Sequence, residues 1–371
     1  MADVNVPVIA PDVAAESLLA AKEAGLTYVS DRDPGIHRIR SGKGFRYIDP
    51  QGRPVREEDT LRRIRSLVIP PAWTDVWICT SSRGHLQATG RDARGRKQYR
   101  YHPRYRSQRD EQKFEGLIEF AEALPRIRRR VSRDLGLRGL PKERALATVV
   151  AFLDKTSIRV GNAEYARDNH SFGATTLKTS HARVKGASIQ LRFKGKSGRL
   201  HTLELNNRRL AAIVRRCHDL PGQELFQYLD ENGEPHPVDS AMVNEYLRTI
   251  SGRDITAKHF RTWHGTLNAA MQLTECGIGA SDTENKRNIV AAVKAVSEHL
   301  GNRPATCRKY YIYPGVLDEY TKGGLGEAMS IDVHPRRHFS EAEQRVLQLL
   351  RHGFTPAIRK TVHRERKSPR D

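Results

Sequence analysis

Residues 189–205 read Ile189-Gln-Leu-Arg-Phe193-Lys-Gly-Lys196-Ser-Gly-Arg-Leu-His-Thr-Leu-Glu-Leu205, with apolar and polar residues alternating on both sides of a turn sequence, 195–198. An alternation with period two is typical of strands that bury one face, and two such runs around a glycine-containing turn predict a β-hairpin. Lys196 should lie in the turn. The flanking sequence is helical in pattern, so the hairpin is expected within a mainly helical domain.

Helices are expected on both sides of the hairpin. Residues 142–156 repeat apolar side chains at helical spacing, and Ser281 with Glu284 matches the capping-box pattern at a helix start. The predicted helices cover residues 114–124, 142–156, 240–250, 257–273, 281–300 and 340–351.

The N-terminal part of the chain has short β-like runs broken by turns. A tail leads into an alanine-rich helix at 13–24, followed by runs at 28–29, 45–48 and 76–80 and a helix at 57–66. The sequence therefore predicts an α+β fold with two domains. Residues 1–107 would form a mainly β domain that includes the tail and short helix of 1–25, and residues 108–371 would form the helical domain, which ends in a basic tail at 355–371.

The charge balance favours a polyanionic partner. The 371 residues contain 64 Lys+Arg against 43 Asp+Glu, a net charge of +21. Nucleic acid is the first expectation and an anionic membrane surface the second. No apolar run is long enough to span a bilayer and no signal-peptide pattern is present, so we expect a soluble, cytoplasmic protein. The 4 cysteines are scattered without a C-x-x-C pair, which indicates neither a zinc site nor a disulfide framework.

A basic stretch, residues 90–106, interleaves cations with Tyr99, Tyr101 and Tyr105. Cations with aromatic neighbours suit a surface that binds phosphates and also contacts sugars or bases. A solvated charged loop is the alternative for this stretch taken alone.

Three cations further along the chain suit phosphodiester chemistry. Arg159 and Arg261 could each donate to two phosphate oxygens, and arginine keeps its proton at neutral pH. Lys196 could instead give up a proton as a general acid from its turn, although neighbouring Lys194 competes for that role. For any one of these residues considered alone, an ordinary surface or ion-paired cation is the alternative.

A candidate nucleophile follows in Leu300-Gly-Asn302-Arg-Pro-Ala-Thr-Cys-Arg-Lys-Tyr-Tyr311. Tyrosine has a pKa of about 10, so only about one molecule in a thousand is the phenolate at neutral pH without help. Clustered arginines would lower that barrier. Tyr310 and Tyr313 are close by, and local chemistry does not select among the three.

Taken together, these motifs resemble the type IB DNA topoisomerases, in the compact poxvirus and bacterial form. The resemblance covers roughly residues 25–315. The matching stretches are Gly25–Tyr28, Pro70–Trp73, Gly90–His102, Ser157–Asn162 with Tyr165, Ser171–Leu177, Phe193–Gly198, Ala257–Trp263 and Leu300 to Tyr311.

The resemblance implies a role for each residue of the site. Tyr311, selected by its distance from Asn302, would form a 3′-phosphotyrosyl bond. Arg159 and Arg261 would stabilise the phosphate in the transition state, and Lys196 would protonate the leaving 5′ oxygen in concert with Arg159. Several family members have histidine where this chain has Asn302, and an asparagine amide can also donate to a phosphate oxygen.

The resemblance also implies a partner, double-stranded DNA, held by a monomer that closes around it as a clamp. Relaxation would need no cofactor, neither ATP nor metal, and the protein would be associated with the nucleoid. The expected DNA contacts are Arg96, Lys97, Gln98, Tyr99, Tyr101 and Tyr165.

Two other functions compete with this interpretation. Tyrosine site-specific recombinases use related catalytic residues, but they usually carry histidine three residues before the second arginine, where this chain has Lys258. A non-enzymatic basic nucleoid protein would account for the charge, yet it would not require the ordered set of site residues.

Overall fold

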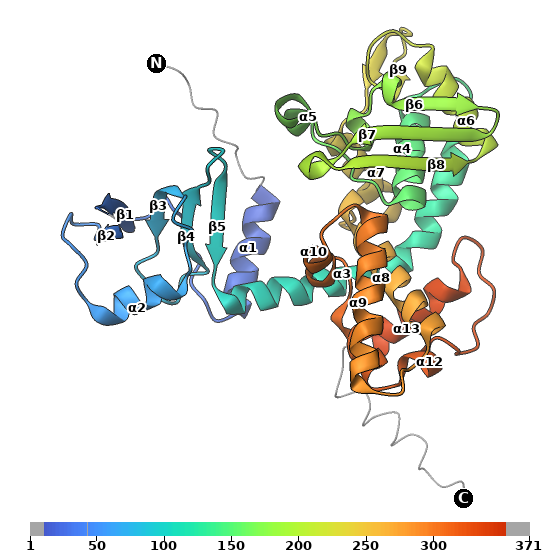
Figure 1. Cartoon of the computed structure of the whole chain (residues 1–371). Helices are drawn as coiled ribbons and strands as arrows, with labels where there is room; N and C mark the ends of the chain where they lie inside the picture. Colours follow the sequence, from blue (N-terminus) through green and yellow to red (C-terminus); the bar gives the residue numbers. More distant parts are fainter. Residues whose placement is uncertain (1–10, 43, 354–371) are drawn as a thin grey trace, which may run out of the picture. The chain divides into compact units, whose positions relative to one another are not determined.

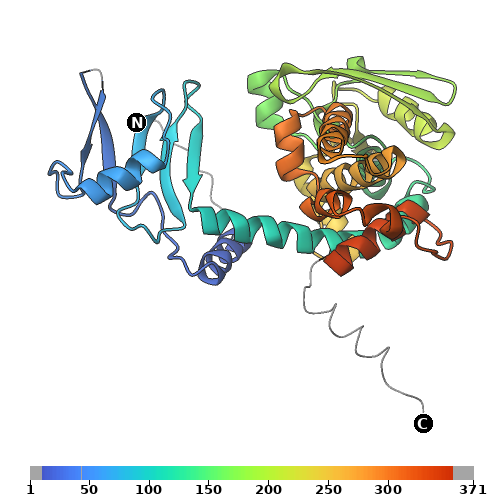
Figure 2. The ribbon, with the colours of Figure 1, turned by 60° about the horizontal axis from the view of Figure 1, so that its bottom comes forward.

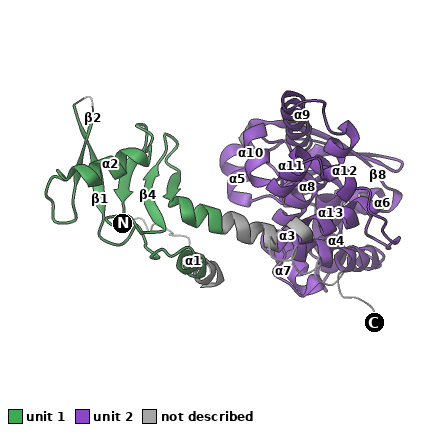
Figure 3. Ribbon diagram, turned by 90° about the horizontal axis from the view of Figure 1, so that it is seen from below, with its two compact units in different colours: residues 1–113 green, residues 114–371 purple. Residues whose placement is uncertain are grey.

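The computed structural model describes residues 11–42 and 44–353, so the predicted basic tail lies outside the described residues. The chain forms two compact units, residues 1–113 and 114–371 (Figure 3). The division between them falls inside one long helix, α3 (Pro103–Asp134).

Helix α3 differs from the prediction, which began a helix at residue 114 and ended it at 124. The helix instead continues through Pro125 and the basic run that follows it. An internal proline removes one backbone hydrogen bond, but here the apolar spacing carries on across it. Phe120, Leu124, Ile127 and Val131 are all buried, and this continuous apolar stripe stabilises the helix beyond the proline.

The first unit is built on an antiparallel sheet with the strand order β2-β1-β3-β4-β5 (Figure 1). Its core contains Ile36, Ile64, Val76, Ile78 and Ala88. The expected run at 28–29 is not a strand; its neighbour Thr27 makes only an isolated bridge to Gly84. The elements are α1 (Pro11–Glu23), β1 (Ile36–Ser41), β2 (Gly44–Ile48), α2 (Glu58–Ser66), β3 (Thr74–Ile78), β4 (Leu86–Arg91) and β5 (Lys97–Tyr101).

The second unit is mainly helical, as predicted, and contains the expected hairpin. Strands β7 (Ser188–Lys194) and β8 (Leu200–Asn206) pair antiparallel, with Phe193 opposite His201. The hairpin is part of a three-stranded sheet with β6 (Ala182–Lys185), which lies along one side of the helices (Figures 1 and 2). A second small sheet pairs β9 (Gln227–Leu229) with β10 (Pro235–Pro237).

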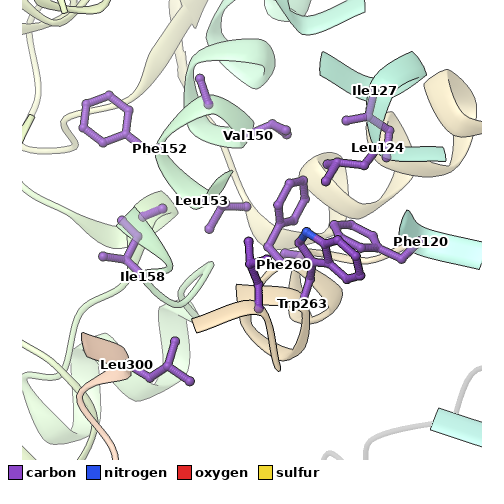
Figure 4. Packing of buried hydrophobic residues seen from close by; sticks show 14 of the residues in the cluster. Phe120, Leu124, Ile127, Val150, Phe152, Leu153, Ile158, Phe260, Trp263 and Leu300 are labelled. Carbon is purple, nitrogen blue, oxygen red and sulfur yellow. The ribbon is translucent and has the colours of Figure 1, made fainter. Parts of the chain in front are cut away.

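Helix α4 (Lys142–Thr156) is the centre of this unit, and most of its side chains are buried. It packs near α3 and near α8 (Ala257–Cys276), where Phe120, Phe260 and Trp263 lie together (Figure 4). The rings of Phe120 and Phe260 meet edge to face, with centroids 4.9 Å apart. The other helices are α5 (Ala163–Asn169), α6 (Arg208–His218), α7 (Ser240–Ser251), α9 (Asp282–Leu300), α10 (Pro304–Tyr310), α11 (Pro314–Thr321), α12 (Leu325–Ala328) and α13 (Glu341–Gly353).

Candidate active site

Arg159 follows the end of α4, where the backbone turns sharply. Ser157 caps the helix in the left-handed region, with φ of 54°, which is uncommon for a residue other than glycine. Its hydroxyl lies 3.1 Å from Nε2 of His299. This contact with His299 holds the turn from which Arg159 projects.

The loop that carries Arg159 packs closely on Gly173. The amide of Ala174 donates to the carbonyl of Arg159 at 2.8 Å. A Cβ atom at Gly173 would lie only 2.6 Å from that carbonyl oxygen, so a larger residue would displace it. Gly173 and Ala174 therefore hold the backbone of Arg159 in place.

Arg261, on α8, is buried and ties together two other parts of the site. Its guanidinium donates to the carbonyl oxygen of Ser157 and, at 2.8 Å, to that of Leu300 at the end of α9. Its Nε has no hydrogen-bond partner among the described residues. A buried donor left unpaired beside a pocket can bind an anion.

Of the three neighbouring tyrosines, Tyr311 lies against the guanidinium of Arg261. The Tyr311 ring centroid is 5.1 Å from the Arg261 guanidinium carbon, whereas Tyr310 is 45% exposed and Tyr313 is only 8% exposed. Burial raises the pKa of Tyr311, but the charges of Arg261, Arg159 and Lys258 outweigh it, so its pKa lies below the ordinary value. Burial, together with Asp318 and Glu319, raises the pKa of Tyr313.

Four of the five predicted catalytic residues line one common cavity: Arg159, Lys196, Arg261 and Tyr311. Lys196 reaches it from the β7–β8 turn, and Tyr165 reaches it from α5. Burial and the charge of Arg261 lower the pKa of Arg159 to about 10, which leaves Arg159 protonated at neutral pH. The residues of the site that line this cavity are Arg159, Tyr165, Lys196, Lys258, Arg261 and Tyr311.

Asn302 is not among the residues that line this cavity, but its side chain contacts Arg159, which does line it. Its Oδ1 accepts a hydrogen bond from the Arg159 guanidinium. Its Nδ2 is buried without a partner among the described residues. Helix α10 separates Asn302 from Tyr311, which explains the nine-residue spacing: the two residues stand at opposite ends of one short helix.

Lys258 was not among the predicted site residues. It lies in the first turn of α8, three residues before Arg261, and so projects on the same side of the helix. Its charge contributes to lowering the pKa of Tyr311. The three-residue spacing to Arg261 is visible in the sequence, where it distinguishes the chain from the recombinase pattern but does not by itself indicate a site residue.

The predicted DNA contacts of the first unit lie on or beside β5, an edge strand of its sheet. Arg96 pairs with Asp92 at 2.7 Å and Lys97 with Asp31 at 2.5 Å. Gln98 donates to Asp92 at 2.9 Å. Tyr99 is 46% exposed, and its ring stacks on Tyr101 with centroids 5.9 Å apart. Because side chains alternate along a strand, Gln98 and Tyr99 project from opposite faces of the sheet.

No helix in the described part of the chain is both long and apolar enough to cross a membrane. No group of three or more His, Cys, Asp or Glu side chains within residues 11–42 and 44–353 is arranged to hold a metal ion.

Comparisons with known proteins agree with the motif resemblance. Residues 102–322 match the family model for the catalytic core of eukaryotic DNA topoisomerase I, and residues 44–92 match that for the N-terminal domain of bacterial DNA topoisomerase IB. The chain is 31% identical over 293 residues to DNA topoisomerase 1B of Acanthamoeba polyphaga mimivirus, covering 77% of this chain and 87% of that protein. It is 21% identical over 274 residues to DNA topoisomerase 1B of Vaccinia virus (strain Copenhagen), covering 71% and 83%.

Among solved structures, the XerH site-specific recombinase bound to its difH substrate aligns with a TM-score of 0.33 and 16% sequence identity. That alignment covers 52% of this chain and 49% of the recombinase, and a likeness this low does not assign the chain to the recombinases. The family model of the catalytic core, by contrast, matches more than half of the chain. The chain therefore belongs to the type IB DNA topoisomerases.

Proposed function

We propose that this chain relaxes supercoiled duplex DNA through a transient covalent bond between Tyr311 and a 3′ phosphate. The observation that carries the proposal is the common cavity lined by Tyr311, Arg159, Arg261 and Lys196. A phosphodiester gains negative charge as it is attacked, and fixed cations placed around it stabilise that charge.

In the cleavage step, the Tyr311 oxygen attacks the phosphorus, and the bond from phosphorus to the 5′ oxygen breaks. The phenol proton passes to water, and the 5′ oxygen takes a proton from Nζ of Lys196. The lowered pKa of Tyr311 favours its phenolate. In religation the 5′ hydroxyl attacks the phosphotyrosine, its proton returns to Lys196, and Tyr311 leaves as the phenolate.

The unpaired donors Arg261 Nε and Asn302 Nδ2 are the proposed binding groups for non-bridging phosphate oxygens. Asn302 would act as the histidine does in other family members, because its amide can donate one hydrogen bond while its Oδ1 orients Arg159. Since the phosphotyrosyl bond retains the energy of the broken phosphodiester, religation needs no ATP.

We further propose that a monomer holds the duplex between two domains, residues 1–107 and 108–371. The exposed Tyr99 on the edge strand β5 and Tyr165 on α5 would contact the DNA directly. Arg96, Lys97 and Gln98 would exchange their present carboxylate partners for phosphates. While this clamp holds one side of the break, the free 5′ end rotates and the supercoils relax. Such a protein would act at the nucleoid, in the cytoplasm.

The test is relaxation of supercoiled plasmid in EDTA without ATP, with wild type and Tyr311→Phe. Wild type should produce relaxed topoisomers, and Tyr311→Phe should produce none, because phenylalanine lacks the attacking oxygen. Covalent capture on a labelled duplex should be lost in the same variant, while DNA binding is retained.

Tyr310→Phe and Tyr313→Phe are the matched controls, and both should relax plasmid. An inactive Tyr310→Phe or Tyr313→Phe alongside an active Tyr311→Phe would overturn the assignment of the nucleophile. Strand exchange between specific sites would instead indicate a recombinase, and binding without cleavage would indicate a non-enzymatic nucleoid protein.

A further inference from the structure

The turn that carries Lys196 is hydrogen-bonded to Asn302, just before the helix that leads to Tyr311. Nη1 of Arg199, at the end of the turn, donates to the backbone carbonyl of Asn302 at 3.1 Å. The side chain of Asn302 accepts from Arg159 at the same time. Asn302 therefore connects two parts of the site: its carbonyl binds Arg199 of the hairpin, and its side chain binds Arg159.

His201 makes a second contact between the same two segments. A Cβ atom on Gly195 would lie 2.6 Å from the imidazole, and one on Gly301 would also collide with it, so the ring fills the space between these glycines. The imidazole stacks on Phe193 with centroids 5.2 Å apart and planes 10° apart. Burial, with the charges of Arg159, Arg261 and Arg199, lowers the pKa of His201 to about 4, so the ring adds no further positive charge at neutral pH.

Within the described residues, hydrogen bonds fix the backbone around Lys196 but not its side chain. The side chain is exposed, and it makes no hydrogen bond or ion pair with other described residues. The turn around it is closed by a hydrogen bond from the Gly195 amide to the Arg199 carbonyl at 2.8 Å. The position of the ammonium group therefore depends on where this turn is held, because a free lysine side chain has many rotamers.

We propose that Arg199 is a positioning residue: through the Asn302 carbonyl it holds the Lys196 turn where the lysine can protonate the leaving 5′ oxygen. This inference rests on the proposed function, in which Lys196 is the general acid. Arg199 itself does not contact the reacting atoms. Its loss should slow proton delivery and leave nucleophilic attack and phosphate binding intact.

The experiment compares single-turnover cleavage of two duplexes by the full-length chain. One duplex has an ordinary scissile phosphodiester, and the other has a 5′-bridging phosphorothiolate, whose thiolate leaves without a proton. Arg199→Ala should cleave the ordinary duplex roughly 10- to 100-fold more slowly than wild type, since small misplacements of a catalytic group have effects of this size. It should cleave the phosphorothiolate duplex at about the wild-type rate, within roughly threefold.

The matched control is Arg192→Ala, which removes the same charge from an exposed position. Arg192 stands opposite Thr202 in the strand register and projects from the other face of the hairpin. This variant should resemble wild type on both duplexes. Arg199→Lys, which keeps the charge but not the planar fork, should fall between Arg199→Ala and wild type on the ordinary duplex.

Lys196→Ala separates the failure of this inference from failure of the proposed function. If Lys196→Ala is rescued by the phosphorothiolate but Arg199→Ala is equally slow on both duplexes, Arg199 does not act through the general acid. An Arg199→Ala variant as fast as wild type on the ordinary duplex would also overturn the inference. If Lys196→Ala is not rescued, the general-acid role in the proposed function is itself wrong.

Discussion

Arg261 Nε and Asn302 Nδ2 are buried N–H donors without a partner among the described residues, and both belong to residues of the proposed site. An unpaired buried donor costs about 1–3 kcal/mol. Arg261 already donates to two backbone carbonyls, which fix its orientation. Its Nε has no such acceptor among the described residues, and in the proposed site a bound phosphate would supply one and remove the cost.

A single glycine on α8 sets how closely this helix approaches the nucleophile. A Cβ atom at Gly265 would collide with the backbone carbonyl oxygen of Tyr311. Replacing a helical glycine with alanine ordinarily gains about 1 kcal/mol, but overpacking here should cost about 1–3 kcal/mol and displace Tyr311. We expect Gly265→Ala to lower both the thermal midpoint and the single-turnover cleavage rate.

Gly326→Ala is the control for that prediction. Gly326 lies in α12, and a Cβ atom there would meet nothing within 4 Å. This variant should keep the wild-type cleavage rate and be no less stable. A Gly265→Ala protein that matched it in both measurements would show that the close approach to Tyr311 is unimportant.

At the scale of elements, one largely buried ionic cluster joins four helices. Arg128 on α3 pairs with Asp154 on α4 at 2.7 Å and with Glu343 on α13 at 2.8 Å. On α8, Trp263 donates to Glu343 at 3.2 Å, and His264 lies 3.2 Å from Asp154. Since α8 carries Arg261, and α4 leads to Arg159, the cluster fixes both arginine-bearing elements. It also gives the C-terminal helix α13 a structural role.

Arg128→Met should destabilise the protein by about 3–5 kcal/mol, because the buried Glu343 and the half-buried Asp154 lose their shared partner. Urea unfolding at neutral pH measures this. Arg129→Met, at an exposed neighbouring position, is the control and should change the free energy of unfolding little. A loss below about 1 kcal/mol in Arg128→Met would mean that the cluster contributes no more than a surface ion pair.

The same cluster predicts a pH dependence. Burial raises the pKa of Asp154, but His264 and Arg128 outweigh it, so its pKa lies below the ordinary value. A carboxylate whose folded pKa is depressed stabilises the fold above its unfolded pKa, about 3.9, and that stability is lost as pH falls through the folded value. Wild type should therefore lose stability below about pH 4. This loss should be smaller in Arg128→Met, where the stabilising partner is absent.

The elements also differ in how far the sequence determines them. The hairpin around Lys196 follows from strict alternation, and the start of α9 follows from Ser281, whose hydroxyl accepts from the Glu284 amide. The Glu284 carboxylate, however, accepts a hydrogen bond from the backbone amide of Ala280 and not from that of Ser281. The second hydrogen bond of the predicted capping box is therefore not formed. The path of α3 through Pro125 depends on tertiary burial of its apolar stripe, which outweighs the local effect of proline.

The site shows the same division between local and tertiary information. The sequence places Arg159, Lys196 and Arg261 in distinctive local contexts, but it does not distinguish Tyr311 from Tyr310 by local chemistry. That distinction requires knowing which ring is half-buried against Arg261 and which is exposed, and this depends on the approach of α8. The contact of Arg199 with Asn302 joins residues 103 positions apart, and no local pattern reveals it.

At the scale of the whole molecule, the net charge of +21 predicts strongly salt-dependent DNA binding. Each phosphate that the protein neutralises releases counterions, so the affinity falls steeply as salt rises. With about six phosphate contacts, the affinity should fall roughly 1,000-fold between 50 and 200 mM salt. Tyr311→Phe, which removes no positive charge, allows the equilibrium to be measured without cleavage and should give the same slope as wild type under non-cleaving conditions. A slope near zero would show that the basic surface does not bind the phosphate backbone.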